Sequence, residues 1–206
     1  MDFYILKEKI EQSEHKIIPS NQYEDGRINS VNDEEEIKKF IRQLFPNNFI
    51  EAGKREWFDF GLSFDNRFYP FNIKSTNGKT ADNVSSKEGL YFALTGRRPE
   101  QDGIKNFKNY NEKIIKYFNP ECEEDYYFLV FIKGEKKVHL TSLKRLNRVI
   151  PNGNNLPFQV HWGKNNFTDS NRSKAEQGKY LLNKYIESFE KRACGLQYLL
   201  EWRETQ

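Results

Sequence analysis

The sequence contains few of the residues that build thiol cross-links or zinc centres. It has two cysteines among 206 residues, Cys122 and Cys194, and neither belongs to a CxxC motif. Structural zinc sites draw closely spaced cysteine and histidine ligands, and a disulfide framework needs several cysteine pairs. We therefore expect neither. His139 and His161 have no partner at metal-ligand spacing, and we interpret both as ordinary polar residues.

Long apolar runs and a strong charge imbalance are also missing from the sequence. No apolar run approaches the roughly 20 residues needed to span a bilayer. The acidic, aromatic N-terminus does not have the pattern of a signal peptide. We therefore expect a soluble cytoplasmic protein with no membrane partner. The net charge is only +3, so the total charge does not by itself indicate a nucleic-acid partner.

Aromatic residues, by contrast, are abundant. They make up 15% of a chain that is 36% hydrophobic and 31% charged, and this is too many rings for a disordered polypeptide. The length suits one compact domain and is short for two. We expect a single domain over 1–206, with N-terminal helices in 1–46, a sheet core in 47–145, and loops followed by a C-terminal helix in 146–206.

The most informative stretch predicts a β-hairpin. Two runs that alternate between apolar and polar residues, Trp57 to Phe64 and Phe68 to Ser75, are separated by a turn-forming tripeptide. The apolar positions expected on one face are Phe58, Phe60, Leu62 and Phe64 in the first strand and Phe71 and Ile73 in the second. Because side chains alternate across a strand, Asp59, Asn72 and Lys74 should meet on the opposite face.

An acid on one strand, followed by a polar-x-Lys triplet on the next, resembles the active-site strand pair of the PD-(D/E)XK nuclease superfamily, which includes most type II restriction endonucleases. The resemblance implies two acids that bind Mg²⁺ and a lysine that helps activate the attacking water. Asp59 matches the first acid, and Asn72-Ile73-Lys74 matches the triplet. The sequence departs from the family pattern at Phe58, where proline is frequent, and at Asn72, where the family has an acid.

The second acid can come from several positions, because an amide is a poor substitute for a carboxylate toward a hard cation. A subset of these endonucleases takes it from the following helix, about thirteen residues after the lysine, where Glu88 stands. Asp82 is a nearer alternative. The catalytic candidates are therefore Asp59, Asn72, Lys74 and Glu88, and the metal ligands among them are Asp59, Glu88 and the side-chain oxygen of Asn72. A structural alternative for Glu88 is a capping box with Ser85 as N-cap.

An earlier acidic run also predicts a helix start. Asp33 to Glu36 has the capping-box spacing, and a buried stripe follows at Ile37, Phe40, Ile41 and Leu44. Acids suit the first turn of a helix, so we interpret Glu34 and Glu35 as structural. A helix at this position of the nuclease family often adds an acid to the site, and this keeps Glu36 as a further candidate.

The remaining pattern predicts an α/β fold with a central mixed β-sheet flanked by helices. The family resemblance implies that this fold is restriction-endonuclease-like. Tyr126 to Ile132 is a continuous apolar run typical of a strand covered on both faces, and Val138 to Thr141 should pair with it. Helices are expected over 2–14, 86–94, 103–118 and 173–203, the last with an interruption near Gly195.

Three segments have the residues to contact DNA. The polar loop after Lys74 offers side-chain donors, the stretch from Lys133 to Arg148 has a net excess of five positive charges, and 152–172 is rich in Asn, Gly and Lys. The predicted DNA-binding residues are Asn77, Lys79, Thr80, Asn83, Lys136, Lys137, Lys164, Asn166, Asn171 and Arg172.

The resemblance thus implies a Mg²⁺-dependent type II restriction endonuclease that acts on double-stranded DNA. It also implies a homodimer, because two active centres are needed to cut both strands of a palindromic site. Two alternatives remain. The first is a DNA-binding module that lost metal binding through Asn72. The second is a junction resolvase or repair nuclease that reads DNA shape.

Overall fold

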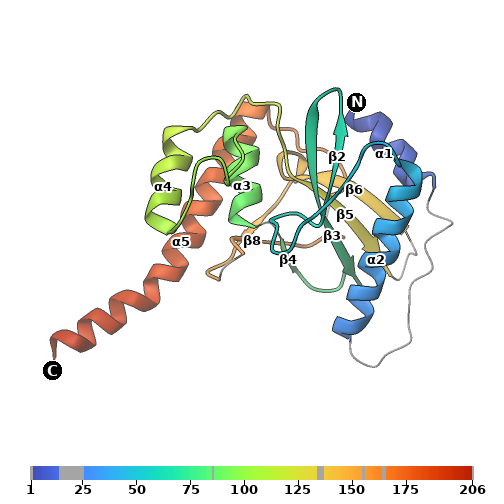
Figure 1. Ribbon diagram of the computed structural model, residues 1–206. Helices are drawn as coiled ribbons and strands as arrows, with labels where there is room; N and C mark the ends of the chain where they lie inside the picture. Colours follow the sequence, from blue (N-terminus) through green and yellow to red (C-terminus); the bar gives the residue numbers. More distant parts are fainter. Residues whose placement is uncertain are drawn as a thin grey trace.

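The structure is a computed structural model, and it describes residues 2–13, 26–84, 86–133, 137–154, 156–163 and 166–205. In the described residues the main sheet has five strands, in the order β1-β2-β3-β5-β6 (Figure 1). The strands are β1 (Phe49–Glu51), β2 (Phe60–Phe64), β3 (Arg67–Thr76), β5 (Tyr127–Ile132) and β6 (Lys137–Ser142). Strands β3 and β5 run parallel, and the other neighbours are antiparallel. The expected mixed sheet is confirmed.

The predicted hairpin is formed by β2 and β3. Phe64 pairs with Arg67 across a two-residue loop, and Asp65 and Asn66 have φ of 51° and 61°. Positive φ at both loop positions matches the right-handed twist of the paired strands, which is why this short loop is favoured. The first strand is shorter than expected, however, and residues 57–59 precede it. Phe58 consequently packs on the opposite core from Phe60, not on the same face.

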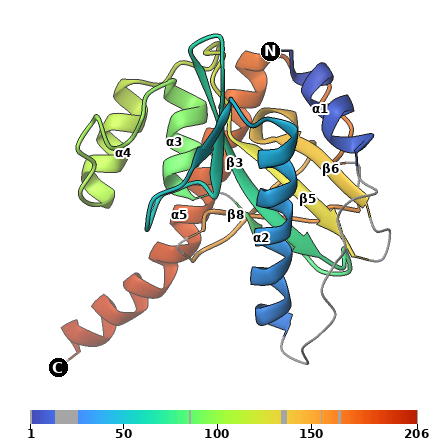
Figure 2. The same cartoon turned by 45° about the vertical axis from the view of Figure 1, so that its right-hand side comes forward.

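Helices cover both faces of the sheet, as Figures 1 and 2 show. One face packs against α1 (Phe3–Glu11) and α2 (Gly26–Leu44), and the other against α3 (Lys87–Thr95), α4 (Phe107–Lys116) and α5 (Lys174–Glu204). A short 3-10 helix, η2 (Leu143–Arg145), follows β6. All six residues of β5 are buried because alternate side chains enter the two cores. The expected α/β class, with helices flanking the sheet, is confirmed.

A smaller antiparallel sheet brings together two segments that are far apart in the sequence. Its order is β4-β8-β7, with β4 (Asp82–Val84), β7 (Ile150–Pro151) and β8 (Phe158–Val160). Val84, Phe158 and Val160 anchor this sheet in the core beneath α3 and α5. The loop that leaves β3 therefore lies beside the segment around β8, and these are two of the segments predicted to contact DNA.

Three details of the helices differ from the sequence predictions. Asp33 does not cap α2, because the helix begins at Gly26 and Asp33 is buried within it, where it forms an ion pair of 3.0 Å with Lys133. The N-cap of α3 is Ser86, whose hydroxyl accepts a hydrogen bond from Gly89 N. Helix α5 is continuous through Gly195. None of the helices described is both long and apolar enough to cross a membrane.

Candidate active site

The site lies where β2 separates from β3. The last register pair of the two strands is Phe60 with Phe71, and β3 continues to Thr76 without β2 beside it. We call this point, where β2 separates from β3, the fork, and Asp59 lies at it. Its backbone N donates to Phe71 O at 2.8 Å, and its Oδ2 accepts a hydrogen bond from Ile73 N at 2.6 Å. The carboxylate thus satisfies a backbone donor that a continuing β2 would have bound, and this holds it against β3.

Asn72 makes the next contact with this carboxylate. Its Nδ2 donates to Asp59 Oδ2 at 2.9 Å, whereas its Oδ1 is buried without a hydrogen-bond partner among the described residues. The bond to Asp59 determines the orientation of the amide. A buried acceptor left unpaired costs about 1–3 kcal/mol, and a bound water or an ion would satisfy such an atom. Both bonds to Asp59 end on Oδ2, so within the described chain Oδ1 accepts none.

Helix α2 brings an acid within electrostatic range of Asp59. The helix packs on the face of β3 that carries Phe71 and Ile73, and there Ser75 Oγ donates a hydrogen bond to Asp33 Oδ2 at 2.8 Å. The next residue, Glu34, has a raised pKa because it is buried and because it lies near the negative charge of Asp59, while the positive charge of Lys74 lowers its pKa. Glu34, Asp59 and Lys74 therefore act on one another electrostatically at one site.

Asp59 also has a raised pKa. Burial is the main cause, and the hydrogen bond from Ile73 and the positive charges of Lys74 and Lys38 oppose it only in part. A nearby cation stabilises the charged form of a buried carboxylate and so lowers its pKa. The pair of Glu34 and Asp59 is thus electrostatically suited to a positive ligand.

Sequence reasoning interpreted Glu34 as structural and preferred Glu36 among the acids of this helix. Glu36 is 54% exposed at its side chain and lies 3.9 Å from Lys39, on the outer side of the helix. The available signal was helical spacing. Glu34 lies three residues before Ile37 and seven before Ile41, both in the buried stripe. These spacings place Glu34 on the side of the helix that faces the sheet.

Glu88 and Asp82 lie on other elements. Glu88, in the first turn of α3, forms an ion pair of 3.4 Å with Lys87 and lines a cavity of about 460 Å³ together with Trp57. Tyr126 donates a hydrogen bond to Trp57 O at 2.7 Å, and after burial the charges of Asp59 and then Glu88 raise its pKa. Asp82 Oδ2, in β4, is buried without a hydrogen-bond partner among the described residues.

The predicted DNA-binding residues of the β3–β4 loop and β4 divide into two sets. Asn77, Lys79 and Thr80 are exposed, and Asn77 Oδ1 accepts a bond from Lys79 N at 2.9 Å, which shapes the loop. Asn83 is also exposed and joins a polar cluster on the small sheet, where its Oδ1 accepts bonds from Asn152 Nδ2 at 2.8 Å and Gln159 Nε2 at 3.0 Å. The small sheet thus connects the two segments through side chains as well as backbone.

Two predicted DNA-binding residues have internal roles. Asn166 is 1% exposed, its Nδ2 donates to His161 O, and its Oδ1 accepts from Arg148 N, so it is not available for base contact. Arg172 donates to Asn147 O and Gln177 Oε1 and stacks 3.9 Å from the ring centroid of Tyr180. Asn171 is exposed. Lys136, Lys164 and the side chain of Lys137 lie outside the described residues.

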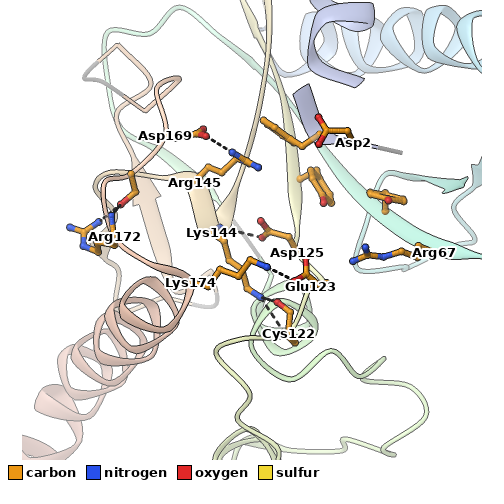
Figure 3. A pocket seen from close by; sticks show the side chains of 14 residues that line it. Asp2, Arg67, Cys122, Glu123, Asp125, Lys144, Arg145, Asp169, Arg172 and Lys174 are labelled. Atoms are coloured by element: carbon orange, nitrogen blue, oxygen red, sulfur yellow. Dashed lines mark hydrogen bonds and ion pairs between the residues drawn. The ribbon is translucent and has the colours of Figure 1, made fainter. Parts of the chain in front are cut away.

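A separate cavity of about 360 Å³ opens near the start of β5, on the side of η2 (Figure 3). Some of its charges are paired, because Arg145 contacts Asp169 and Lys174 contacts Glu123. Lys144 donates to Cys122 O at 2.6 Å, and burial raises the pKa of the Cys122 thiol.

The donor set at the fork fits a hard divalent cation. Among the described residues no three histidine, cysteine or carboxylate side chains form a group able to hold a metal ion. The fork instead offers the carboxylate of Asp59 and the unpaired Oδ1 of Asn72, and Glu34 of α2 lies within electrostatic range of Asp59. Mg²⁺ prefers oxygen ligands and keeps several waters, and one or two carboxylates together with a substrate phosphate suffice to bind it.

A scan against protein-family models found no match to this chain, and a search of curated proteins found none either. The residues and their geometry are therefore what indicates a function.

Proposed function

We propose that this chain is a Mg²⁺-dependent endonuclease that hydrolyses phosphodiester bonds in specific sequences of double-stranded DNA. We further propose that its fold is that of the PD-(D/E)XK superfamily and its activity that of a type II restriction endonuclease. One observation carries the proposal. Asp59, Asn72 and Lys74 gather at the fork between β2 and β3, and Glu34 of α2 joins them.

Asp59, Glu34 and the Oδ1 atom of Asn72 would hold the metal ion. Such an ion, when bound, supplies a Lewis acid that polarises the scissile phosphate and stabilises the developing negative charge. Asp59 is kept in position by its bond from Ile73 N, and the amide of Asn72 by its bond to Asp59. These contacts preorganise the oxygen ligands before substrate arrives, so little reorganisation is needed in the reaction.

Lys74 completes the site from the same face of β3. Its positive charge lowers the pKa of both acids, so its ammonium lies within electrostatic reach of each. In the proposed reaction, Lys74 Nζ donates a hydrogen bond to the attacking water and orients it for in-line attack. Glu34, whose pKa is raised by burial and by Asp59, is the acid that we propose accepts the proton from that water.

DNA would lie across the β3–β4 loop and the small sheet. Lys79 and Thr80 are exposed in a loop that continues directly from the strand of Lys74, so donors for phosphate oxygens are adjacent to the site. The amides of Asn83, Asn152 and Gln159 form one cluster on β4 and β8. Amides of this kind recognise adenine in the major groove.

Incubation of supercoiled plasmid with the full chain and Mg²⁺ tests the proposal. We expect discrete fragments, no cleavage in the presence of a chelator, and loss of cleavage in Asp59→Ala. Sequencing of the fragment ends would then give the recognition site. Binding without cleavage would overturn the proposal in favour of an inactive DNA-binding module, and cleavage of branched DNA alone would overturn it in favour of a resolvase.

A further inference from the structure

Four amide side chains on the small sheet form one chain of hydrogen bonds, which we call the amide network. Asn83 and Gln159 are a register pair of β4 and β8, so their side chains stand on the same face of the sheet. Asn83 Oδ1 accepts bonds from Gln159 Nε2 at 3.0 Å and from Asn152 Nδ2 at 2.8 Å. Asn152 Nδ2 also donates to Asn154 Oδ1 at 2.8 Å, and Leu156 N donates to the same oxygen at 3.1 Å.

One backbone group determines the orientation of all four amides. An amide side chain can be turned so that its oxygen and nitrogen exchange places, but a backbone N–H can only donate. Leu156 N therefore requires an oxygen at Asn154, and this oxygen requires a nitrogen at Asn152. That nitrogen requires an oxygen at Asn83, which in turn requires a nitrogen at Gln159. The hydrogen bonds of the amide network thus have a single direction.

This orientation leaves one donor and one acceptor on neighbouring amides. Asn83 Oδ1 already accepts two bonds, so the group of Asn83 that remains for a ligand is the Nδ2 donor. Gln159 uses Nε2 within the amide network, so its remaining acceptor is Oε1. Among the described residues neither atom forms a hydrogen bond. Asn83 is exposed and Gln159 is half-buried, so both can be reached from outside.

The segment that carries the amide network is attached to the body of the protein. From α5, Ser188 Oγ donates to Asn152 O and Lys191 Nζ donates to Pro151 O at 3.0 Å. Phe158, the neighbour of Gln159 in β8, is fully buried in the core. These contacts limit the movement of the network, so its donor and acceptor are preorganised for a partner.

The arrangement of donor and acceptor matches the major-groove edge of adenine. That edge presents the N7 acceptor beside the N6 amino donor, whereas guanine presents two acceptors, N7 and O6. With adenine, the Asn83 amide donates to N7 and the Gln159 oxygen accepts from N6. With guanine, the Gln159 oxygen would face another acceptor with no proton between them. The major groove also admits two paired β-strands, which is the form in which β4 and β8 present these residues.

We propose that the amide network recognises adenine in double-stranded DNA, with Asn83 Nδ2 donating to N7 and Gln159 Oε1 accepting from N6. Asn152 and Asn154 are positioning residues, because they determine which atom of Asn83 is left for the base. The inference rests on the proposed function in taking duplex DNA as the ligand, and it does not depend on cleavage. It adds to that function the base, the atoms that recognise it and the cause of their orientation.

Base analogues test the recognition. Selection of duplexes bound by the full chain from a random pool, with Ca²⁺ in place of Mg²⁺, gives the preferred sequence apart from cleavage. Each adenine is then replaced by 7-deazaadenine, which lacks the N7 acceptor. We expect at least one replacement to weaken binding by the wild type about 10-fold. In Asn83→Asp, which keeps the internal oxygen and loses the donor, the same replacement should no longer weaken binding. Asn183→Asp adds the same charge on the exposed side of α5 and should keep the 10-fold effect.

Two variants of Asn154 test the positioning role. Asn154→Ala removes the oxygen that holds the Asn152 amide, so the effect of 7-deazaadenine on binding should become smaller. Asn154→Asp keeps an oxygen for both Leu156 N and Asn152 Nδ2, so it should restore the full effect. Equal effects in Asn154→Ala and the wild type would overturn the positioning role.

The same measurements separate this inference from the proposed nuclease activity. A preferred sequence without adenine, or an effect of 7-deazaadenine that persists in Asn83→Asp, would overturn the inference even if plasmid is cleaved. The expected analogue pattern together with intact plasmid would support the inference and overturn the nuclease proposal alone. A wild type that binds no DNA would overturn both.

Discussion

Asn72 donates a hydrogen bond of 2.9 Å to the carboxylate of Asp59, and its own carbonyl oxygen is left buried and unpaired among the described residues. The position at which the resemblance implies an acid thus holds an amide that supports the neighbouring acid. In the proposed site, the free oxygen of that amide would be a neutral metal ligand beside the carboxylate of Asp59. Asn72 is therefore built into the site, and its replacement has consequences that can be measured.

Asn72→Asp should reduce stability without metal and restore it with metal. The substitution removes the Nδ2 donor and brings two carboxylates into contact, which we expect to cost about 1–3 kcal/mol at neutral pH. Mg²⁺ should then raise the melting temperature of the variant more than that of the wild type. Asn171→Asp makes the same change at an exposed position and should have little effect. An equal response to Mg²⁺ in wild type and Asn72→Asp would contradict the assigned position of the ion.

Lys74→Met should lower the cleavage rate about 100-fold or more and leave binding of DNA nearly unchanged, because the ammonium acts on the reacting water and not on the duplex. Single-turnover cleavage and a separate binding titration in Ca²⁺ measure the two quantities. A variant that loses affinity and rate together would assign Lys74 to DNA binding. Lys38→Met, which removes the other positive charge that acts on Asp59, should have the smaller effect on rate.

Lys79→Ala should weaken DNA binding to a similar extent for all sequences, and it should lower the slope of log affinity against log salt by about one. Lys79 is exposed in the loop beside the site, and the loss of one phosphate contact releases one fewer counterion. Lys108→Ala, on the exposed side of α4, is the control and should keep the wild-type slope. If both variants have the wild-type slope, the β3–β4 loop does not contact phosphate.

Glu34→Gln should stabilise the fold at neutral pH. The pKa of Glu34 is raised above its ordinary value of 4.5 because of burial and Asp59. The folded state then holds the proton more tightly than the unfolded state, so the wild type loses stability as the pH rises through the interval above 4.5. We expect a gain on the order of 1 kcal/mol at about pH 7.5 that shrinks at about pH 4. Denaturant unfolding of Glu34→Gln and of the exposed control Glu36→Gln would show whether the gain is specific to the site.

The pairing of strands could be predicted from the sequence more fully than the set of acids. A period of two places Asp59, Asn72 and Lys74 on one side, and the hairpin register confirms the strand pairing. The capping-box spacing at Asp33 was misleading because α2 starts seven residues earlier and uses Asp33 for a buried ion pair. This ion pair depends on how α2 crosses β3, which no local pattern records. The helical spacing of Glu34 from Ile37 and Ile41 was the available signal for its place in the proposed site.

The burial of individual side chains is a second property that the sequence did not reveal. Asn166 and Arg172 were predicted as DNA contacts because amides and arginines recognise bases. In the fold the amide of Asn166 binds the backbone at His161 and Arg148, and Arg172 stacks on Tyr180. The same donors that bind DNA also satisfy buried backbone groups, and only the tertiary structure distinguishes the two uses.

The central claim is that Glu34, Asp59, Asn72 and Lys74 form one metal-dependent site. It is tested most directly by comparing the rates at which the wild type, Glu34→Gln and Glu36→Gln cleave plasmid DNA in Mg²⁺. We expect the wild type and Glu36→Gln to cleave at similar rates. Glu34→Gln should cleave about 100-fold more slowly, or more slowly still. Intact plasmid with the wild type, or equal rates for the two variants, would contradict the claim.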